Sequence, residues 1–390
     1  MFSSRVPRQL HANAFAQALS AARVRGRDLI DLTITNPTRC GITYPAQLFT
    51  RLSDPEVAQY RPEPFGMRSA REAVAADYAR RRIQTRWDRI VLTASTSEAY
   101  SVLFKLLCAP EGDQVLVPAP SYPLFDHLTA LDGVGAIQYA LHYDGRWWVD
   151  LDTLDRAWTP RLRAVLAVSP NNPTGSVVSD EEYLALMERC SARNAALIVD
   201  EVFADYALSP AIEAASAAAS AAPACLSFRL GGLSKSAALP QLKLGWIAVD
   251  GPAPLVAGAL QRLELICDTY LSVSTPVQVA APDLIDGGAA PRAQVLERIR
   301  SNYRMLRELA SRHPSVDVLN TNAGWSAVIR VAARASEEEI TVDLLEREGV
   351  VVYPGFFFDF PREAFLVVSL LPEPAQFHEG VRRVLERVDG

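Results

Sequence analysis

Lysine is scarce in this chain, and two of the three lysines lie close together in an apolar segment. Lys235 and Lys243 are eight positions apart within Gly231–Trp246, whereas Lys105 fits an exposed helix position. The other 36 basic residues are arginines. A lysine amine can lose its proton and form an imine, which an arginine cannot do. The ordinary alternative is that both lysines are solvated loop residues, but their small and apolar neighbours argue against this interpretation. Lys235 and Lys243 are therefore the first candidates for chemistry.

Two polar segments that each follow a predicted strand suit the binding of a flat, phosphorylated molecule. Thr93–Ala99 is rich in small hydroxyl residues and opens a helix, where free backbone N–H groups and the helix dipole attract an anion. Taken alone, this segment is more simply explained as an ordinary helix cap. Pro118–Pro123 contains Tyr122 between prolines, so its ring could present a rigid face to a flat ring or could pack on the core.

Two further strand ends carry an amide and a carboxylate. Asn172 lies in Ser169–Gly175, which has turn chemistry but could also direct an amide at a phenolic oxygen. Asp200 follows the apolar run Ala195–Val199, and a carboxylate in that position must be solvated or paired. It could cap the next helix, or it could pair with a protonated ring nitrogen.

The elements that position these residues alternate between strands and helices. An apolar run with no polar position, such as residues 196–199, is typical of a strand that is covered on both faces. The alternation predicts an α/β fold with a mostly parallel sheet, and ligands of such sheets bind beyond the carboxyl ends of the strands. The predicted strands are Arg89–Thr93, Gln114–Val117, Arg163–Val168, Ala195–Val199 and Leu244–Val249, and the predicted helices include Ser97–Cys108 and Glu181–Arg193.

The two ends of the chain differ in character from the middle. The first 27 residues lack acidic side chains, as transit peptides do, but apolar residues recur at helical spacing from Leu10 to Ala22, which favours a helical arm. The Ala/Ser-rich stretch Ile212–Ala224 predicts a surface helix and linker. A helical region from Pro282 through Arg312 precedes strand candidates Ala327–Val331 and Phe365–Ser369. We therefore expect an N-terminal arm with part of a small domain (1–40), a large domain (41–281) and a small C-terminal α/β domain (282–390).

Composition excludes several classes of protein. Of the 390 residues, 49% are hydrophobic, which argues against disorder, and the net charge of −6 argues against a nucleic-acid coat. No apolar run approaches the roughly 20 residues of a membrane helix. The five scattered cysteines form neither a disulfide framework nor a zinc motif. We expect a cytoplasmic enzyme that binds small molecules, with no metal, no nucleic acid and no membrane partner.

Taken together and in this order, the motifs resemble those of the class I/II aminotransferases, which are fold-type I enzymes dependent on pyridoxal 5′-phosphate (PLP). The resemblance covers most of the chain and implies a large PLP-binding domain, built on a sheet of the mostly parallel seven-stranded type flanked by helices, and a smaller α/β domain. The matching segments are Tyr60 with Gly66 and Arg71-Glu72-Ala73, then N-N-P-T-G at 171–175, D-E-V at 200–202, S-K-S at 234–236, and Ser272–Gln278.

The resemblance also implies a role for each candidate residue. Lys235 would form the internal aldimine and later move a proton between the substrate Cα and the cofactor. Asp200 would keep the pyridinium nitrogen protonated, Asn172 would donate to the phenolic oxygen, and Tyr122 would stack on the ring. Tyr60 would reach the phosphate of a neighbouring subunit, which implies a homodimer with shared sites. The remaining cofactor contacts would come from Ser95, Thr96, Ser97, Phe203, Ser234 and Lys243.

Four positions depart from the family pattern. Phe203 stands where a tyrosine is usual, Gly232 where a phosphate-binding serine is usual, and Lys243 where an arginine is usual; we interpret these three as changes that tune the cofactor. Val367 stands where an arginine normally binds the substrate carboxylate. Either the register differs, or another arginine substitutes, or the substrate has no such carboxylate. Our leading substitute is Arg39, with Asn36 beside it. The neighbouring run of phenylalanines at 356–358 could line an apolar pocket or fill the core.

We therefore predict an aminotransferase that moves an amino group between an amino compound and a 2-oxo acid by a ping-pong mechanism. The same groups also serve PLP-dependent lyases, cyclising synthases and decarboxylases, and the missing arginine adds weight to those alternatives. A non-catalytic PLP-binding regulator is a less favoured alternative, because such regulators typically attach a DNA-binding domain and we expect neither room for one nor a basic patch in this chain. A nicotinamide enzyme would need G-x-G-x-x-G, which the sequence lacks.

Overall fold

The computed structural model describes residues 2–7, 12–209 and 223–390. The predicted helix and linker at Ile212–Ala224 falls almost wholly outside the described residues, and so does Leu10 at the start of the predicted helical arm. The rest of that arm forms helix α1 (Ala14–Val24), which Asn13 caps by accepting the N–H of Ala16.

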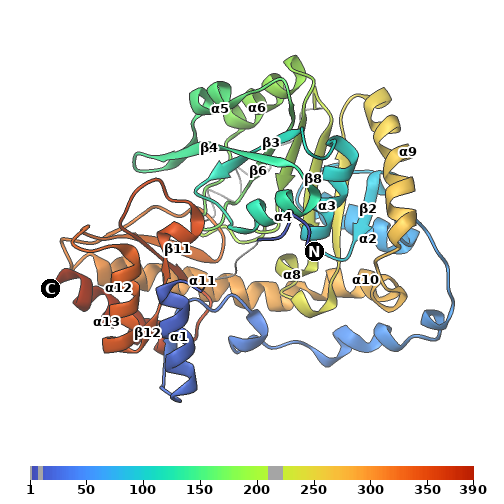
Figure 1. The fold of residues 1–390 in the computed structure, drawn as a ribbon. Helices are drawn as coiled ribbons and strands as arrows, with labels where there is room; N and C mark the ends of the chain where they lie inside the picture. The colour runs from blue at the N-terminus through green and yellow to red at the C-terminus, as the bar shows by residue number, and fades with distance from the viewer. Residues whose placement is uncertain (1, 8–11, 210–222) are drawn as a thin grey trace.

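The large sheet has eight strands among the described residues, in the spatial order β2-β9-β8-β7-β6-β3-β4-β5. Figure 1 labels β2, β3, β4, β6 and β8 of this sheet. Strands β8, β7, β6, β3 and β4 run parallel to one another, whereas β9 is antiparallel to both β2 and β8. The eighth strand arises because the chain turns at Gly145 and adds β5 antiparallel to β4 at the sheet edge. The bounds are β2 (Ile90–Thr93), β3 (Gln114–Ala119), β4 (Gly135–Tyr143), β5 (Trp147–Val149), β6 (Leu162–Val168), β7 (Ala196–Asp200), β8 (Ser227–Gly232) and β9 (Gly245–Asp250).

Helices cover both faces of this sheet, which explains why its central strands are apolar throughout. Every residue of β7 is buried: Ile198 packs in the core on one face and Leu197 in the core on the other. The first core also contains side chains from α3, α4 and α9, and the second contains side chains from α5 and α6. These helices are α3 (Thr96–Leu107), α4 (Leu124–Asp132), α5 (Leu151–Ala157), α6 (Asp180–Ala192) and α9 (Ala253–Tyr270).

Strand β8 was missed by the sequence pattern, although it leads directly to Lys235. Its sequence S-F-R-L-G-G breaks an apolar run with Arg229 and two glycines. The structure resolves the conflict because Arg229 is buried and forms an ion pair with Glu201, which follows β7. Such an ion pair allows a guanidinium to occupy a central strand, and the local sequence pattern does not predict the pair.

A second, antiparallel sheet has the order β10-β11-β14-β13. Its β11 and β14 pack on α11 and α13 in a separate core. The N-terminal segment joins this part of the molecule, since β1 pairs in parallel with β12. The division of the chain at residues 40 and 281 stays a prediction, and α10 runs across the second of these positions. The bounds are β1 (Ile30–Asp31), β10 (Asp317–Val318), β11 (Ser326–Arg330), β12 (Val350–Val351), β13 (Tyr353–Pro354), β14 (Phe365–Ser369), α2 (Arg68–Arg80), α8 (Leu233–Ser236), α10 (Thr275–Gly287), α11 (Ala289–Ala310), α12 (Glu337–Asp343) and α13 (Pro374–Asp389).

None of the helices in the described part of the chain is both long and apolar enough to cross a membrane.

Candidate active site

A cavity of about 580 Å³ lies beyond the carboxyl ends of the parallel strands, which is the usual ligand position in such sheets. Val168, Asp200 and Gly232 are the last residues of β6, β7 and β8, and all three line it. The wall also contains residues from the second sheet, so the cavity lies between the two sheets. Ten residues predicted from the sequence meet here: Ser95, Thr96, Ser97, Tyr122, Asn172, Asp200, Phe203, Ser234, Lys235 and Lys243.

Lys235 projects into this cavity from the short helix α8. Its Nζ lies 5.0 Å from the centroid of the Trp325 ring and 5.7 Å from that of Phe203. The Tyr206 hydroxyl donates to the Lys235 carbonyl oxygen and holds the backbone in place. Burial lowers the pKa of the Lys235 amine, and the opposing attraction of Asp200 does not cancel this effect. The amine therefore loses its proton more readily than a surface lysine does, as a nucleophilic amine must.

Asp200 provides a carboxylate at the floor of the cavity, where it is only 8% exposed. Its Oδ2 accepts a hydrogen bond from the Tyr100 hydroxyl at 2.9 Å, and its Oδ1 accepts one from the Val202 N–H at 3.1 Å. Burial raises the pKa of Asp200 to about 6, although both hydrogen bonds act in the opposite direction. A nearby cation would favour the ionised carboxylate further, so the position suits pairing with a protonated ring nitrogen.

Tyr100 is a site residue that the sequence analysis missed. It lies in the interior of α3, lines the cavity, and packs edge-on against Phe125 at 5.3 Å. No motif marks it, because a tyrosine within an apolar helix face indicates core. Its position in the sequence could have indicated it, because Tyr100 lies one helical turn after Thr96 and therefore on the same face of α3.

The loops that carry Asn172 and Tyr122 are held against each other. The Asn171 Nδ2 donates to Ser121 Oγ at 3.2 Å, while Asn172 accepts through Oδ1 from Ser326 Oγ at 3.2 Å. An amide that accepts through its oxygen keeps NH₂ protons with which it can donate to a ligand. Tyr122 is 46% exposed, and burial of the remainder raises the pKa of its phenol, so this ring stays neutral.

The N-terminus of α3 forms one end of the cavity. Ser95, whose own backbone is extended, caps the helix by accepting the Glu98 N–H at 3.1 Å. Strand β9 passes close by: a Cβ on Gly245 would lie 2.8 Å from the carbonyl carbon of Ser95 and 3.0 Å from the Thr96 nitrogen. Lys243 adds a positive charge to the same wall. A helix N-terminus with a neighbouring cation suits a phosphate group.

All four positions at which the sequence departs from the family pattern line the cavity: Phe203, Gly232, Lys243 and Val367. Phe203 packs edge-on against Trp325, with 5.4 Å between the ring centroids. Gly232 ends β8, and Val367 lies in the middle of β14, where it pairs with Val328 on one side and Tyr353 on the other. Of the phenylalanine run, Phe357 and Phe358 line the cavity, whereas Phe356 does not line it and is 41% exposed.

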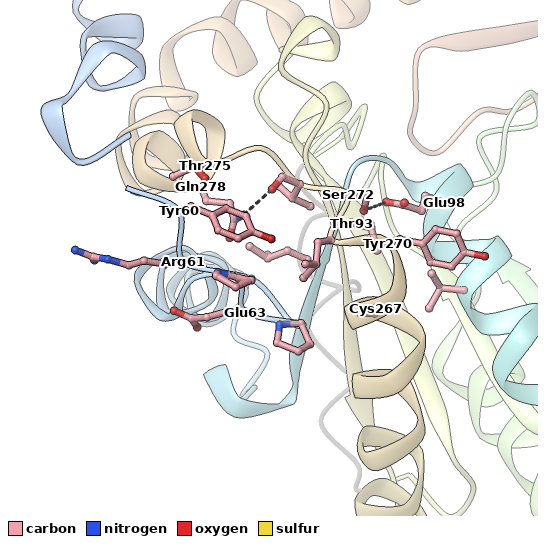
Figure 2. Close-up of a pocket in the computed structure, with 17 residues that line it drawn as sticks. Tyr60, Arg61, Glu63, Thr93, Glu98, Cys267, Tyr270, Ser272, Thr275 and Gln278 are labelled. Carbon is pink, nitrogen blue, oxygen red and sulfur yellow. Dashed lines mark hydrogen bonds between the residues drawn. The ribbon is translucent and has the colours of Figure 1, made fainter. Parts of the chain in front are cut away.

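Tyr60, Asn36 and Arg39 do not line this cavity. Tyr60 is 79% exposed and borders a separate hollow of about 50 Å³ between the segment before α2 and the loop after α9 (Figure 2). Asn36 accepts the Thr38 N–H at 3.1 Å and caps a single turn, at the end of which Arg39 is exposed to solvent. The N-terminal segment reaches the cavity instead through two residues that the sequence analysis did not select, Thr33 and Thr35.

Comparison with known proteins agrees with this geometry. The family model described as aminotransferase class I and II matches residues 38–384. The chain belongs to the class I and II aminotransferases. It is 25% identical over 371 residues to the glutamate-pyruvate aminotransferase AlaA of Haemophilus influenzae, covering 92% of this chain and 90% of that protein. It is 26% identical over 379 residues to the alanine aminotransferase of Mycobacterium tuberculosis, covering 93% of this chain and 87% of that protein.

Solved structures of aminotransferases share the fold. The alanine aminotransferase of Pyrococcus furiosus superposes with a TM-score of 0.87 at 19% identity, covering 99% of both chains. An aminotransferase of Escherichia coli superposes with a TM-score of 0.86 at 23% identity, covering 100% of this chain and 98% of that one.

Class I and II aminotransferases depend on PLP, and the cavity residues fit this cofactor. PLP carries an aldehyde, a basic ring nitrogen and a phosphate. The cavity provides an amine of lowered pKa at Lys235, a buried carboxylate at Asp200, and the N-terminus of α3 with Lys243. The lack of a side chain at Gly245 lets β9 pass directly against the Ser95–Thr96 turn, because a Cβ there would lie 2.8 Å from the carbonyl carbon of Ser95.

Proposed function

We propose that this aminotransferase transfers an amino group between an amino acid, or another amine, and a 2-oxo acid in two alternating half-reactions, and that Lys235 holds the cofactor. The observation that supports this most is that Lys235 and Asp200 line one cavity with the N-terminus of α3. When bound, PLP supplies an aldehyde that exchanges its oxygen for the substrate nitrogen and a ring that accepts the electrons of the substrate C–H bond.

Each cavity residue has a distinct task in this proposal. Lys235 would hold the cofactor through its Nζ, and the same Nζ would carry a proton to and from the substrate carbon. The negative charge of Asp200 keeps a proton on the ring nitrogen, and the hydroxyl of Tyr100 keeps Asp200 ionised. Phosphate and ring contacts would come from Ser95, Thr96, Ser97, Ser234, Lys243, Asn172, Phe203 and Tyr122.

Two measurements test this proposal. Borohydride reduction of the PLP-loaded protein, followed by peptide mass mapping, should place the cofactor on Lys235, and Lys235→Ala should abolish the label while the protein still folds. Label on Lys105 or Lys243, the other two lysines, would refute the assignment. Amino donors should bleach the visible band of the bound cofactor and 2-oxo acids should restore it. Release of pyruvate and ammonia instead would indicate a lyase.

The second part of the proposal is a homodimer in which Tyr60 reaches the phosphate of the partner's cofactor. Tyr60 and Tyr270, 79% and 58% exposed, border the same hollow, and Leu265 nearby in α9 is 73% exposed. Large apolar groups of this kind are typical of surfaces that a partner covers. Analytical ultracentrifugation should give twice the chain mass, and Tyr60→Phe should weaken PLP binding without changing that mass. We also propose a cytoplasmic location, which suits five free cysteines.

A further inference from the structure

In the part of the chain that the structure describes, no guanidinium lies in the wall of the cavity. Its charged lining residues are Asp200, Lys235 and Lys243, each of which the proposed function assigns to the cofactor. Although the chain has 36 arginines, none of those in the described residues lines the cavity. Once the cofactor is bound, no cation of this wall remains to pair with a substrate carboxylate.

The register of β14 excludes that a neighbouring residue of this strand faces the cavity in place of Val367. Val367 and Phe365 pack with the core of the large sheet, whereas Leu366 and Val368 pack with the core between the second sheet and α11. Because side chains alternate along a strand, a slip by one residue would expose Leu366 and Val368 to the cavity and bury Val367 among the helices. Five consecutive pairs with β11, from Ser326 to Arg330, fix the observed register.

The wall around Val367 is aromatic and offers only neutral hydrogen-bond donors. Trp325, Tyr353 and Phe357 lie in the same wall. The Trp325 Nε1 is buried and has no hydrogen-bond partner among the described residues, and Ser369 adds a hydroxyl, whereas the Ser326 hydroxyl already donates its proton to Asn172. Neutral donors suit a carbonyl or hydroxyl oxygen, whereas a carboxylate transferred into such surroundings loses its hydration without gaining a counter-charge.

We infer that one of the two substrates is a primary amine with an apolar or aromatic body and with no carboxylate on the carbon that carries the amine. The inference rests on the proposed function. The amine carbon exchanges NH₂ and one hydrogen for a carbonyl oxygen, and the 2-oxo acid exchanges its carbonyl oxygen for NH₂ and a hydrogen, so no external oxidant or water is consumed. The 2-oxo acid then binds through neutral donors alone, which predicts a high KM for it.

A matched pair of donors tests this inference. Phenethylamine and L-phenylalanine differ only in the carboxylate, and so do butylamine and L-norvaline. For the PLP-loaded protein, the rate of cofactor conversion divided by donor concentration should be at least about tenfold higher for each amine than for its amino acid. The reason is that the carboxylate of the amino acid would enter the cavity without a counter-charge, at a free-energy cost that corresponds to this factor or more.

Variants at position 367 provide the control. Val367→Arg should raise the rate for L-phenylalanine about tenfold or more and lower the rate for phenethylamine, whereas Val367→Met adds length without charge and should keep the preference for the amine. Calorimetry provides a readout without turnover: 3-phenylpropanoate should bind Val367→Arg at least about tenfold more tightly than it binds wild type or Val367→Met.

Several results would overturn the inference. If wild type prefers L-phenylalanine, a guanidinium from Arg39 or from a partner subunit reaches the cavity, and Arg39→Ala distinguishes these two sources. Conversion by amino acids but by no simple amine also refutes it, while the aminotransferase function stands. If borohydride places no cofactor on Lys235, the proposed function itself fails. Should Val367→Arg not fold, the two donor pairs on wild type still decide.

Discussion

Removal of a single oxygen tests how this chain keeps its buried carboxylate ionised. The hydroxyl of Tyr100 donates to Asp200 at 2.9 Å, and Tyr100→Phe deletes it without changing the ring. A hydrogen bond to a charged group contributes about 1.5–3 kcal/mol, and a pKa change of one corresponds to about 1.36 kcal/mol. The pKa of Asp200, which burial already raises to about 6, should therefore rise by roughly one to two. At neutral pH the carboxylate then loses its charge in half of the molecules or more.

The assay is the affinity for PLP as a function of pH. In wild type, Asp200 is ionised above about pH 6, so affinity should fall as the pH drops through that value. In Tyr100→Phe the fall should begin at a higher pH, so that affinity near neutrality is up to about tenfold lower and the two proteins converge in alkaline solution. Tyr139→Phe is the matched control, because its buried hydroxyl donates to the Leu166 carbonyl at 2.8 Å and its side chain does not line the cavity.

The reasoning is refuted if the pH curves of Tyr100→Phe and wild type superimpose, or if Tyr139→Phe moves the curve as far. A merely structural role for the Tyr100 hydroxyl would lower stability in both variants and leave both midpoints in place. Unfolding by urea, measured in parallel, separates these two outcomes.

Three other variants probe the remaining groups. Lys243→Ala should weaken the binding of PLP several-fold but leave the binding of pyridoxal, which lacks the phosphate, unchanged; equal losses for both would contradict the phosphate contact. Phe203→Tyr should shift the pH midpoint of the visible cofactor band, and superimposable titrations would show that this hydroxyl is irrelevant. Glu201→Gln breaks buried pairs with Arg229 and Arg81 and should lower the free energy of unfolding by about 3–5 kcal/mol at neutral pH. Burial raises the pKa of Glu201, but the two arginines outweigh it, so that the pKa lies below its normal value. The ionised carboxylate therefore stabilises the fold above the unfolded pKa of about 4.3, and this stabilisation is lost in acid. Urea unfolding of the variant and of wild type should converge there.

Much of the cavity could be predicted from sequence because its residues follow strands. Ser95, Tyr122 and Asn172 lie in segments that follow strands with a visible apolar pattern, and Asp200 is the last residue of such a strand. Parallel strands bring their carboxyl ends to one edge. Lys235 was found differently, by residue type, since lysine is so rare in this chain. Strand β8, which positions it, was not found.

Other parts of the site could not be predicted because their neighbours are distant in sequence. Tyr100 meets Asp200 across 100 positions, and Ser326 meets Asn172 across 154. Thr33 and Thr35 reach the cavity because β1 pairs with β12, more than 300 positions later. No local pattern encodes such pairings, so the sequence analysis selected Asn36 and Arg39 in that segment instead.

The sequence by itself determined which chemistry this protein carries, since an amine, a carboxylate and a phosphate-binding helix start are properties of residue types and of the local backbone. Only the tertiary structure decided what surrounds that chemistry. It placed Tyr100 against Asp200, turned Val367 toward the cavity, and left every arginine of the described residues out of the wall. The physical reason is that burial, counter-charge and pKa depend on the groups a side chain contacts after folding, and those groups come from segments far apart along the chain.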